Sequence, residues 1–164
     1  MSLVPKHIKE LKPYVAGKSK QEFKRKFGNR ESIKLASNEN PLGCSPKSLQ
    51  RVQAQMSSCN RYPDSSGFEL RKKLADRYDL DMSNVIIGSG SEGIMSNIMR
   101  TFLSADDKII SSRHSFIGFR VLADASGYHT DWIPMKDYHY DLDAIADQID
   151  NQTKIIYLAN PDNP

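Results

Sequence analysis

The sequence has few cysteines and no long apolar run. The two cysteines, Cys44 and Cys59, can form at most one disulfide, and their spacing matches no metal site, so we expect free thiols in a reducing compartment. No apolar stretch approaches the roughly 20 residues that span a bilayer. The first residues, MSLVPKHIKELKPY, lack the apolar core of a secretory signal. These absences predict a cytoplasmic protein with no metal and no membrane partner.

Positive charge is concentrated near the N-terminus, although the net charge of the chain is only +3. Residues 1–30 hold nine Lys or Arg against two Glu, a balance of +7, so the rest of the chain sums to −4. A basic arm can bind nucleic acid, but aromatic side chains that would stack on bases are not interleaved with these cations. We therefore expect a solvated arm and no nucleic-acid partner.

Short apolar runs alternate with segments of helical spacing in the second half of the chain. Such alternation predicts an α/β fold whose strands pair in parallel through right-handed crossovers. The continuous apolar runs VII, KII and KIIYLA predict strands that are covered on both faces. Expected strands cover residues 85–87, 108–111, 128–133 and 154–159, and expected helices cover 5–11, 46–55, 68–78, 91–103, 116–126 and 142–149, with Ser45 and Asp141 as caps.

The expected strand at 85–87 runs into a glycine-rich turn, GSGSEG, and then into a helix. A helix N-terminus offers unpaired amides and a partial positive charge, which suit any phosphate. Gly88, Gly90 and Gly93 spell the G-x-G-x-x-G fingerprint of dinucleotide sites, but NAD also needs an acidic residue about 20 positions further on. Residues 110–113 hold no acid, which disfavours NAD, whereas Arg113 leaves an NADP-binding oxidoreductase domain open.

Five segments occur in a recognisable order: IKLASNENPLG, RYPD, GSGSEG, HSFIGF and LANPDNP. Together they resemble the fold-type-I pyridoxal-phosphate aminotransferases, and SNENPLG with RYPD narrows the resemblance toward the histidinol-phosphate branch. The resemblance implies an N-terminal arm and the first half of a large three-layer α/β/α domain. It divides the chain into a basic arm at 1–30, substrate and interface loops with a short helix at 31–66, and the first half of the cofactor-binding domain at 67–164.

The resemblance also implies that pyridoxal 5′-phosphate is the cofactor and assigns residues to it. The backbone amides of Ser91 and Glu92 would hold its phosphate, and Phe116 would stack on its pyridine ring. Asn163 would hydrogen-bond its 3′-oxygen, while Tyr62 would reach the phosphate held by the other subunit of a homodimer. The residues that would line the substrate side are Tyr14, Asn38, Glu39 and Asn40.

Each of these residues also has a purely structural interpretation. Without the resemblance, Phe116 is about as typical of a core aromatic as of a stacking ring. Tyr62 lies beside a proline and is typical of a turn, and Asn38 and Asn40 are common turn residues. His114 belongs to a side-chain type whose ordinary pKa is near neutrality, but it is assigned no catalytic role.

The chain departs from the family pattern at several positions. It has His114-Ser115-Phe116 where the family usually has Pro-Thr-Tyr or Pro-Thr-Phe. It has NPDNP where the family has NPNNP, so Asp162 adds a charge beside Asn163. No lysine stands in the family's Ser-x-x-Lys context, so no catalytic residue is assigned within the 164 residues. We expect the chain, which ends in a loop, to be the front part of a longer protein and inactive alone.

For the full-length parent, the resemblance implies transamination of histidinol phosphate with 2-oxoglutarate, in exchange with glutamate, for histidine biosynthesis. Two alternatives within the same superfamily are a threonine-phosphate decarboxylase and an aromatic aminotransferase. A hypothesis of a different class is a non-enzymatic truncated fragment that dimerises or interacts through its arm and its exposed sheet edge.

Overall fold

The computed structural model describes residues 2–163, which form two compact units. Of the described residues, one unit combines 2–14 with 74–163, and the other spans Val15–Lys73. Within residues 2–163, no helix is long and apolar enough to cross a bilayer. The second unit contains α2 (Lys20–Phe27), α3 (Pro46–Gln55), the 3₁₀ turn η1 (Met56–Ser58) and the beginning of α4 (Phe68–Tyr78).

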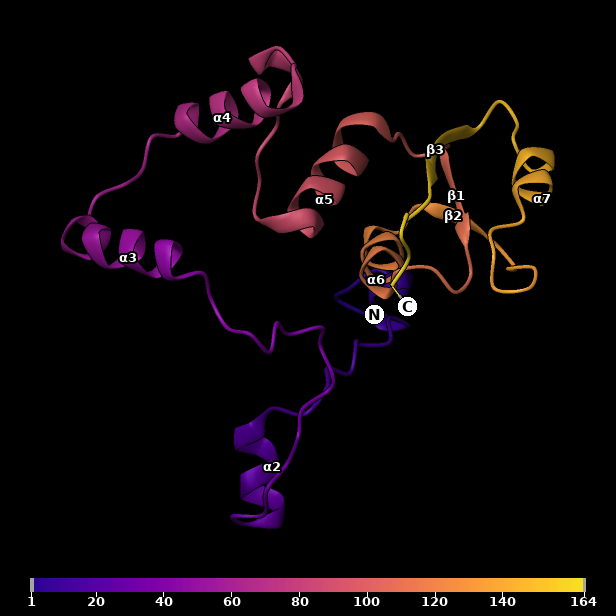
Figure 1. Ribbon diagram of the computed structural model, residues 1–164. Coiled ribbons are helices and arrows are strands. Elements are labelled where there is room, and N and C mark those ends of the chain that lie inside the picture. Colours follow the sequence, from indigo (N-terminus) through magenta and orange to yellow (C-terminus); the bar gives the residue numbers. More distant parts are fainter. Residues whose placement is uncertain (1, 164) are drawn as a thin grey trace. The chain divides into compact units, whose positions relative to one another are not determined.

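A three-stranded parallel sheet lies at the centre of the first unit (Figure 1). The strand order is β2-β1-β3, and the central strand pairs in parallel with both neighbours, so the predicted α/β fold with parallel pairing is confirmed. The elements of this unit after α4 are, in chain order, η2 (Met82–Asn84), α5 (Gly90–Phe102), β1 (Lys108–Ser112), α6 (Ile117–Ser126), β2 (His129–Ile133), α7 (Leu142–Asp147) and β3 (Thr153–Tyr157), and α1 (Lys6–Lys9) precedes them.

Helices cover both faces of β1. On one face, Met99 of α5 and Phe119 of α6 pack with Ile109. On the other face, Ile145 of α7 packs with Ile110. Successive side chains of a strand point to opposite faces, so these two neighbouring isoleucines face two different helix layers. The unit therefore has the three α/β/α layers that the sequence predicts.

Burial differs sharply between the central strand and its neighbours. β1 is buried along its whole length, because it has a strand on each side and helices on each face. β3 lies at an edge of the described sheet, and its Lys154 and Ile156 are exposed, the latter by 43%. The prediction that the run KIIYLA is covered on both faces is therefore wrong in this structure. Only the face that carries Ile155 and Tyr157 packs against the α5–α6 layer.

The expected strand at 85–87 does not form in the described part of the chain. Val85 has extended backbone and is buried, but Ile86 is 78% exposed. A strand is stable only when a neighbour satisfies its backbone hydrogen bonds, and among residues 2–163 the named strands pair only with one another. Residues 85–87 have a strand-like sequence, but in this structure they form an extended segment that leads into α5.

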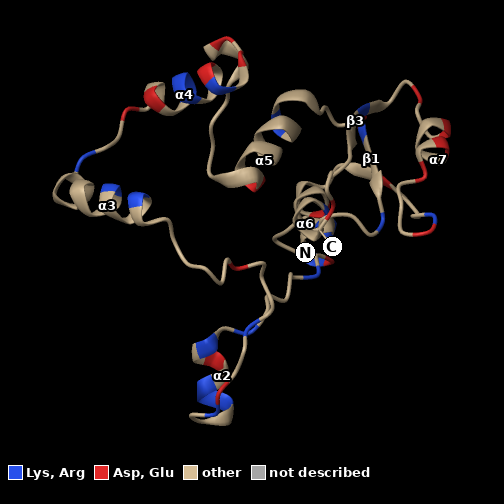
Figure 2. Cartoon of the chain, viewed as in Figure 1, with Lys and Arg blue, Asp and Glu red and all other residues tan. Residues whose placement is uncertain are grey.

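Most helix predictions are confirmed, and one helix was missed. α3 and α4 occupy the predicted residues, and the Asp141 side chain caps α7 by accepting from the Ala144 amide at 3.0 Å. The missed helix is α2, where the Ser19 hydroxyl accepts from the Glu22 amide at 3.1 Å. The sequence signal was the Ser-x-x-Glu spacing of a capping box. Figure 2 shows that this helix carries several of the arm's Lys and Arg residues.

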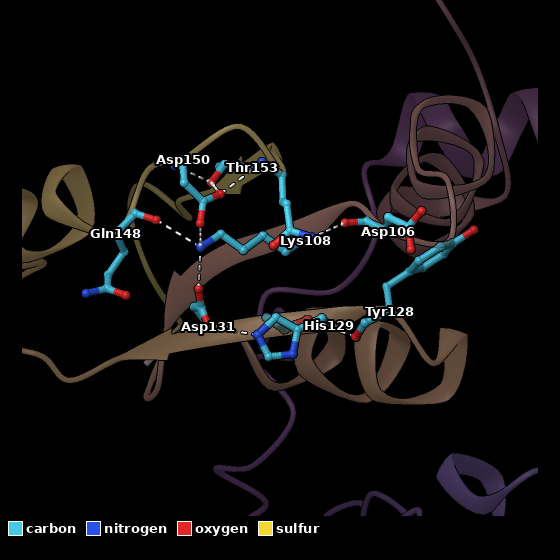
Figure 3. A network of polar contacts seen from close by, with 10 residues as sticks. Asp106, Lys108, Tyr128, His129, Asp131, Gln148, Asp150 and Thr153 are labelled. Carbon is cyan, nitrogen blue, oxygen red and sulfur yellow. Dashed lines mark hydrogen bonds and ion pairs between the residues drawn. The ribbon is translucent and has the colours of Figure 1, made fainter.

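Lys108, the first residue of β1, binds the middle of β2 and the segment that precedes β3 (Figure 3). Its side chain is 9% exposed, and its ammonium lies 2.9 Å from both Asp131 of β2 and Asp150, which precedes β3. It also donates to the Gln148 carbonyl at 3.0 Å. The hydrogen bonds to Asp150 and Asp131 raise the pKa of Lys108, and those from Lys108 lower the pKa of both carboxyls.

We expect Lys108→Met to lower the urea midpoint of unfolding at pH 7, because it leaves the Asp131 and Asp150 carboxylates without their cation. The lowered carboxyl pKa values stabilise the fold above about pH 4 and lose that effect in acid, and the raised lysine pKa stabilises it below about pH 10 and loses that effect in base. The difference in urea midpoint between Lys108→Met and the wild type should therefore be largest between about pH 4 and pH 10 and should shrink outside this range. Lys154→Met, at an exposed lysine of β3, is the matched control. Equal midpoints for both variants at pH 7 would contradict this account.

Candidate cofactor site

The carboxyl ends of the three parallel strands lie at one edge of the sheet, and a loop follows each strand there. Two buried serines at the end of β1 bind the last residues of both neighbours. The Ser111 hydroxyl donates to the Tyr157 carbonyl at 3.0 Å, and the Ser112 hydroxyl donates to the Ile133 carbonyl at 3.1 Å. These bonds satisfy polar groups inside the core and fix the strand ends from which the site loops leave.

The glycine turn presents the first amides of α5. Gly90 has a φ of 70°, a left-handed conformation that side chains disfavour. At Gly88 an added Cβ would lie 2.8 Å from the Ile94 Cδ1 atom, so a side chain there would require the Ile94 side chain to move. The N-cap residue, Ser89, makes no side-chain cap bond to the first turn. The first-turn amides, including those of Ser91 and Glu92, are therefore left without a capping side chain and suit an anion.

Phe116 lies where the loop after β1 enters α6, next to the beginning of α5. Its ring is partly buried and packs against the α5–α6 core cluster, so the structural interpretation holds in part. An added Cβ at Gly118 would come within 2.6 Å of the Phe116 ring and 3.1 Å of the Glu92 carboxylate. The Phe116 ring and the Glu92 carboxylate therefore both lie close to Gly118, which places the aromatic ring near the helix start predicted to hold the phosphate.

Asp162 points toward the loops that follow β1 and β2. Its Oδ1 accepts from the Ser115 hydroxyl at 3.2 Å and from the Asn163 amide at 2.8 Å, and its Oδ2 accepts from the Tyr140 hydroxyl at 2.7 Å. The negative charge that Asp162 adds to the family pattern is therefore stabilised by hydrogen bonds from Ser115, Tyr140 and the Asn163 backbone amide. The same contacts bring Asn163 to the edge that carries Phe116.

Sequence reasoning missed two residues of this arrangement, Tyr140 and Gly118. Tyr140 has no motif around it, but the unexpected carboxylate at Asp162 was an indirect signal, because a partly buried carboxylate requires nearby donors. Gly118 follows Phe116 by two residues, and nothing in the sequence distinguishes it from a glycine tolerated in a helix. Only the close approach of the ring and the Glu92 carboxylate reveals its role.

The predicted substrate residues of the second unit have local partners there. The Asn40 side chain donates to the Gly43 carbonyl at 3.0 Å, which stabilises a turn. Glu39 forms an ion pair with Lys34. Asn38 has a positive φ of 49°, as turn asparagines often do. These contacts agree with the structural interpretation, and the substrate role of these residues stays a prediction.

The two predicted tyrosines of the site are exposed. Tyr62, in the second unit, is exposed as fully as in an extended chain, and Tyr14, in the first unit, is 62% exposed. The roles predicted for both tyrosines stay predictions. Among residues 2–163, no group of three or more His, Cys, Asp or Glu side chains is arranged to hold a metal ion.

Comparison with known proteins decides the family. Residues 30–164 match the family described as "Aminotransferase class I and II". The chain belongs to this family. Both the glycine turn and the loop carrying Asn163 lie within the matched range, so they are parts of an aminotransferase fold.

Curated relatives share more than a third of their residues with this chain. A histidinol-phosphate aminotransferase of Idiomarina loihiensis is 38% identical over the whole chain, and one of Stutzerimonas stutzeri is 39% identical. The chain spans 45% of the length of each of these two relatives.

Solved structures confirm the fold class. A histidinol-phosphate aminotransferase from Sinorhizobium meliloti, solved in complex with pyridoxal-5′-phosphate, matches the whole chain with a TM-score of 0.83 at 24% identity. An aspartate aminotransferase from Thermotoga maritima matches 98% of the chain with a TM-score of 0.77 at 18% identity. The chain covers 44% and 46% of these two structures, respectively. The predicted fold, the first half of the large domain of the fold-type-I aminotransferases, is confirmed.

Gly118→Ala should destabilise the protein by about 1–3 kcal/mol, because the new methyl group would overlap the Phe116 ring in a packed region. The measurement is the free energy of unfolding from urea titration. Gly93→Ala is the matched control, since a Cβ there would meet no atom closer than 3.4 Å and alanine favours a helix. Equal stability of the two variants would show that the ring is not held against Gly118.

Proposed function

We propose that a protein of the relatives' length that carries this chain is a pyridoxal-phosphate-dependent histidinol-phosphate aminotransferase. The observation that carries the proposal is the identity of 37–39% to histidinol-phosphate aminotransferases along nearly the whole chain. The protein would exchange an amino group between histidinol phosphate and 2-oxoglutarate, in the cytoplasm, as a homodimer. The chain contains no lysine in the family's Ser-x-x-Lys context, so the 164 residues alone would not transaminate.

The described residues fit pyridoxal phosphate in donor type. The first-turn amides of α5, at Ser91 and Glu92, would bind the phosphate, because the N-cap residue supplies no side-chain acceptor for that turn. The Glu92 carboxylate lies near the Gly118 backbone, so the contribution of this residue to a phosphate would come from its amide. When bound, the cofactor supplies an electron sink that allows amino groups to be exchanged.

Other residues of the chain would orient the cofactor and the substrate. Phe116 would cover one face of the pyridine ring and exclude water from it, and the Asn163 side chain would hydrogen-bond the 3′-oxygen. Tyr62 would reach across the dimer to the phosphate in the other subunit. The residues proposed for the substrate side are Tyr14, Asn38, Glu39 and Asn40.

The direct test is the half-reaction of the full-length protein with glutamate. With glutamate alone, we expect stoichiometric formation of pyridoxamine phosphate and 2-oxoglutarate. With histidinol phosphate and 2-oxoglutarate together, we expect the amino group to move from histidinol phosphate to 2-oxoglutarate, which yields glutamate. Both products can be measured by mass spectrometry. Release of carbon dioxide from threonine phosphate without amino transfer would replace the proposal with a decarboxylase, and absence of any pyridoxamine phosphate would rule out an aminotransferase.

Asn163→Ala should weaken binding of pyridoxal phosphate by about 10- to 100-fold, since it removes a hydrogen bond to a charged oxygen. Absorbance titration of the apoprotein measures this affinity. Asn97→Ala, on the exposed face of α5, is the control and should bind as the wild type does. An unchanged affinity for Asn163→Ala would remove this residue from the site.

A further inference from the structure

One polar network joins the three loops that follow the three strands. Ser115 lies in the loop after β1, Tyr140 in the loop after β2, and Asp162 in the loop after β3. The Tyr140 hydroxyl oxygen lies 3.0 Å from the Ser115 hydroxyl and 2.7 Å from Asp162 Oδ2. It also accepts from the Ala159 amide at 3.1 Å and lies 3.0 Å from the Ala159 carbonyl oxygen, so the tyrosine contacts the loop after β3 at two residues, Ala159 and Asp162.

The Tyr140 hydroxyl can donate only one hydrogen bond. Two acceptors of the loop after β3 lie within reach, the Ala159 carbonyl oxygen at 3.0 Å and Asp162 Oδ2 at 2.7 Å, and the shorter contact with a charged oxygen makes Asp162 Oδ2 the favoured acceptor. Burial, together with the nearby Asp162 carboxylate, raises the pKa of Tyr140 above its usual value of 10.0, so the hydroxyl keeps its proton at neutral pH. Among the described residues, Oδ2 has this single donor, whereas Oδ1 has two, the Asn163 backbone amide at 2.8 Å and the Ser115 hydroxyl at 3.2 Å, whose one proton is shared between Oδ1 and the Tyr140 oxygen.

The network adjoins two residues of the proposed site. Ser115 immediately precedes Phe116, and Asp162 immediately precedes Asn163. A change in the bonds of the network therefore acts on the ring and on the amide side chain through one peptide unit each. Tyr138 lies in the same loop as Tyr140 but is 97% exposed, so a substitution at Tyr138 is a control for a substitution at Tyr140.

We propose that Ser115, Tyr140 and Asp162 form a positioning network that holds Phe116 and Asn163 in the arrangement that binds the cofactor, with the Tyr140 hydroxyl as the essential donor to Asp162. This inference rests on the proposed function. None of the three residues touches the cofactor in this account. They act through the two neighbours that do.

The network makes a graded prediction for single substitutions. Tyr140→Phe removes the one described donor to Asp162 Oδ2. It should weaken binding of pyridoxamine phosphate about tenfold or more, because a carboxylate oxygen is left without its donor. Ser115→Ala should have a smaller effect, since the Asn163 amide still binds Oδ1. Tyr138→Phe, the matched control, should have none.

The decisive comparison is a double-mutant cycle between positions 140 and 162. Asp162→Asn replaces the charge with a neutral amide, which costs less to leave partly unsatisfied. Tyr140→Phe should therefore weaken binding by less than about threefold when it is made in the Asp162→Asn background. A network that only stabilised the fold through independent contacts would give the same loss in both backgrounds.

The experiment uses the full-length apoprotein and pyridoxamine phosphate, which forms no Schiff base with a lysine, so the affinity reports positioning alone. The dissociation constant and the visible circular dichroism of the bound ring are measured for each variant. We expect Tyr140→Phe to weaken binding and reduce the dichroism, with partial recovery in the double variant. Wild-type binding with unchanged affinity and dichroism in Tyr140→Phe and Ser115→Ala would overturn the positioning role. Failure of the wild type to bind either cofactor form would instead overturn the proposed function.

Discussion

Parallel pairing of β1 with both of its neighbours is the constraint on which the rest of the structure depends. It places the carboxyl ends of three strands at one edge, so residues separated by up to 47 positions, such as Ser115 and Asp162, meet in space. It also makes β1 the strand that is buried from end to end. Crevices at the carboxyl ends of parallel strands are where α/β folds bind ligands, and every cofactor residue proposed in the first unit follows a strand or begins a helix.

The two ends of this sheet use polar groups differently. Near the amino end of β1, the Lys108 ammonium lies between two carboxylates and a carbonyl, and these contacts connect β1 with β2 and with the segment before β3. At the carboxyl ends, Ser111 and Ser112 bind the backbone of the neighbouring strands, and Tyr140 binds the loops beyond them. The proposed cofactor site would require both a stable sheet and a precisely fixed edge, because its ring and amide side chains would have to be placed to within about 0.5 Å.

Local sequence signals predicted the elements well where their partners lie within the chain. Periodic apolar spacing located α4, and the Asp141 cap located α7, because both signals act over a few residues. The segment 85–87 carries an equally strong apolar run, but strand formation depends on a distant pairing partner that no local pattern encodes. Likewise, the exposed Ile156 of β3 reflects its place in the sheet, since its apolar run resembles that of the buried β1.

The sequence predicted only those residues of the candidate site that belong to recognisable motifs. The resemblance assigned the glycine turn, Phe116 and Asn163 to the proposed site, whereas it assigned no role to Tyr140, because the contacts of Tyr140 arise only where three loops meet. The most direct test of the account is a crystal structure of the full-length protein with pyridoxal phosphate. The account predicts the phosphate at the first turn of α5, the pyridine ring against Phe116, and Asp162 still bound to Tyr140. A cofactor bound elsewhere, or an Asp162 carboxylate turned toward the pyridine ring, would contradict it.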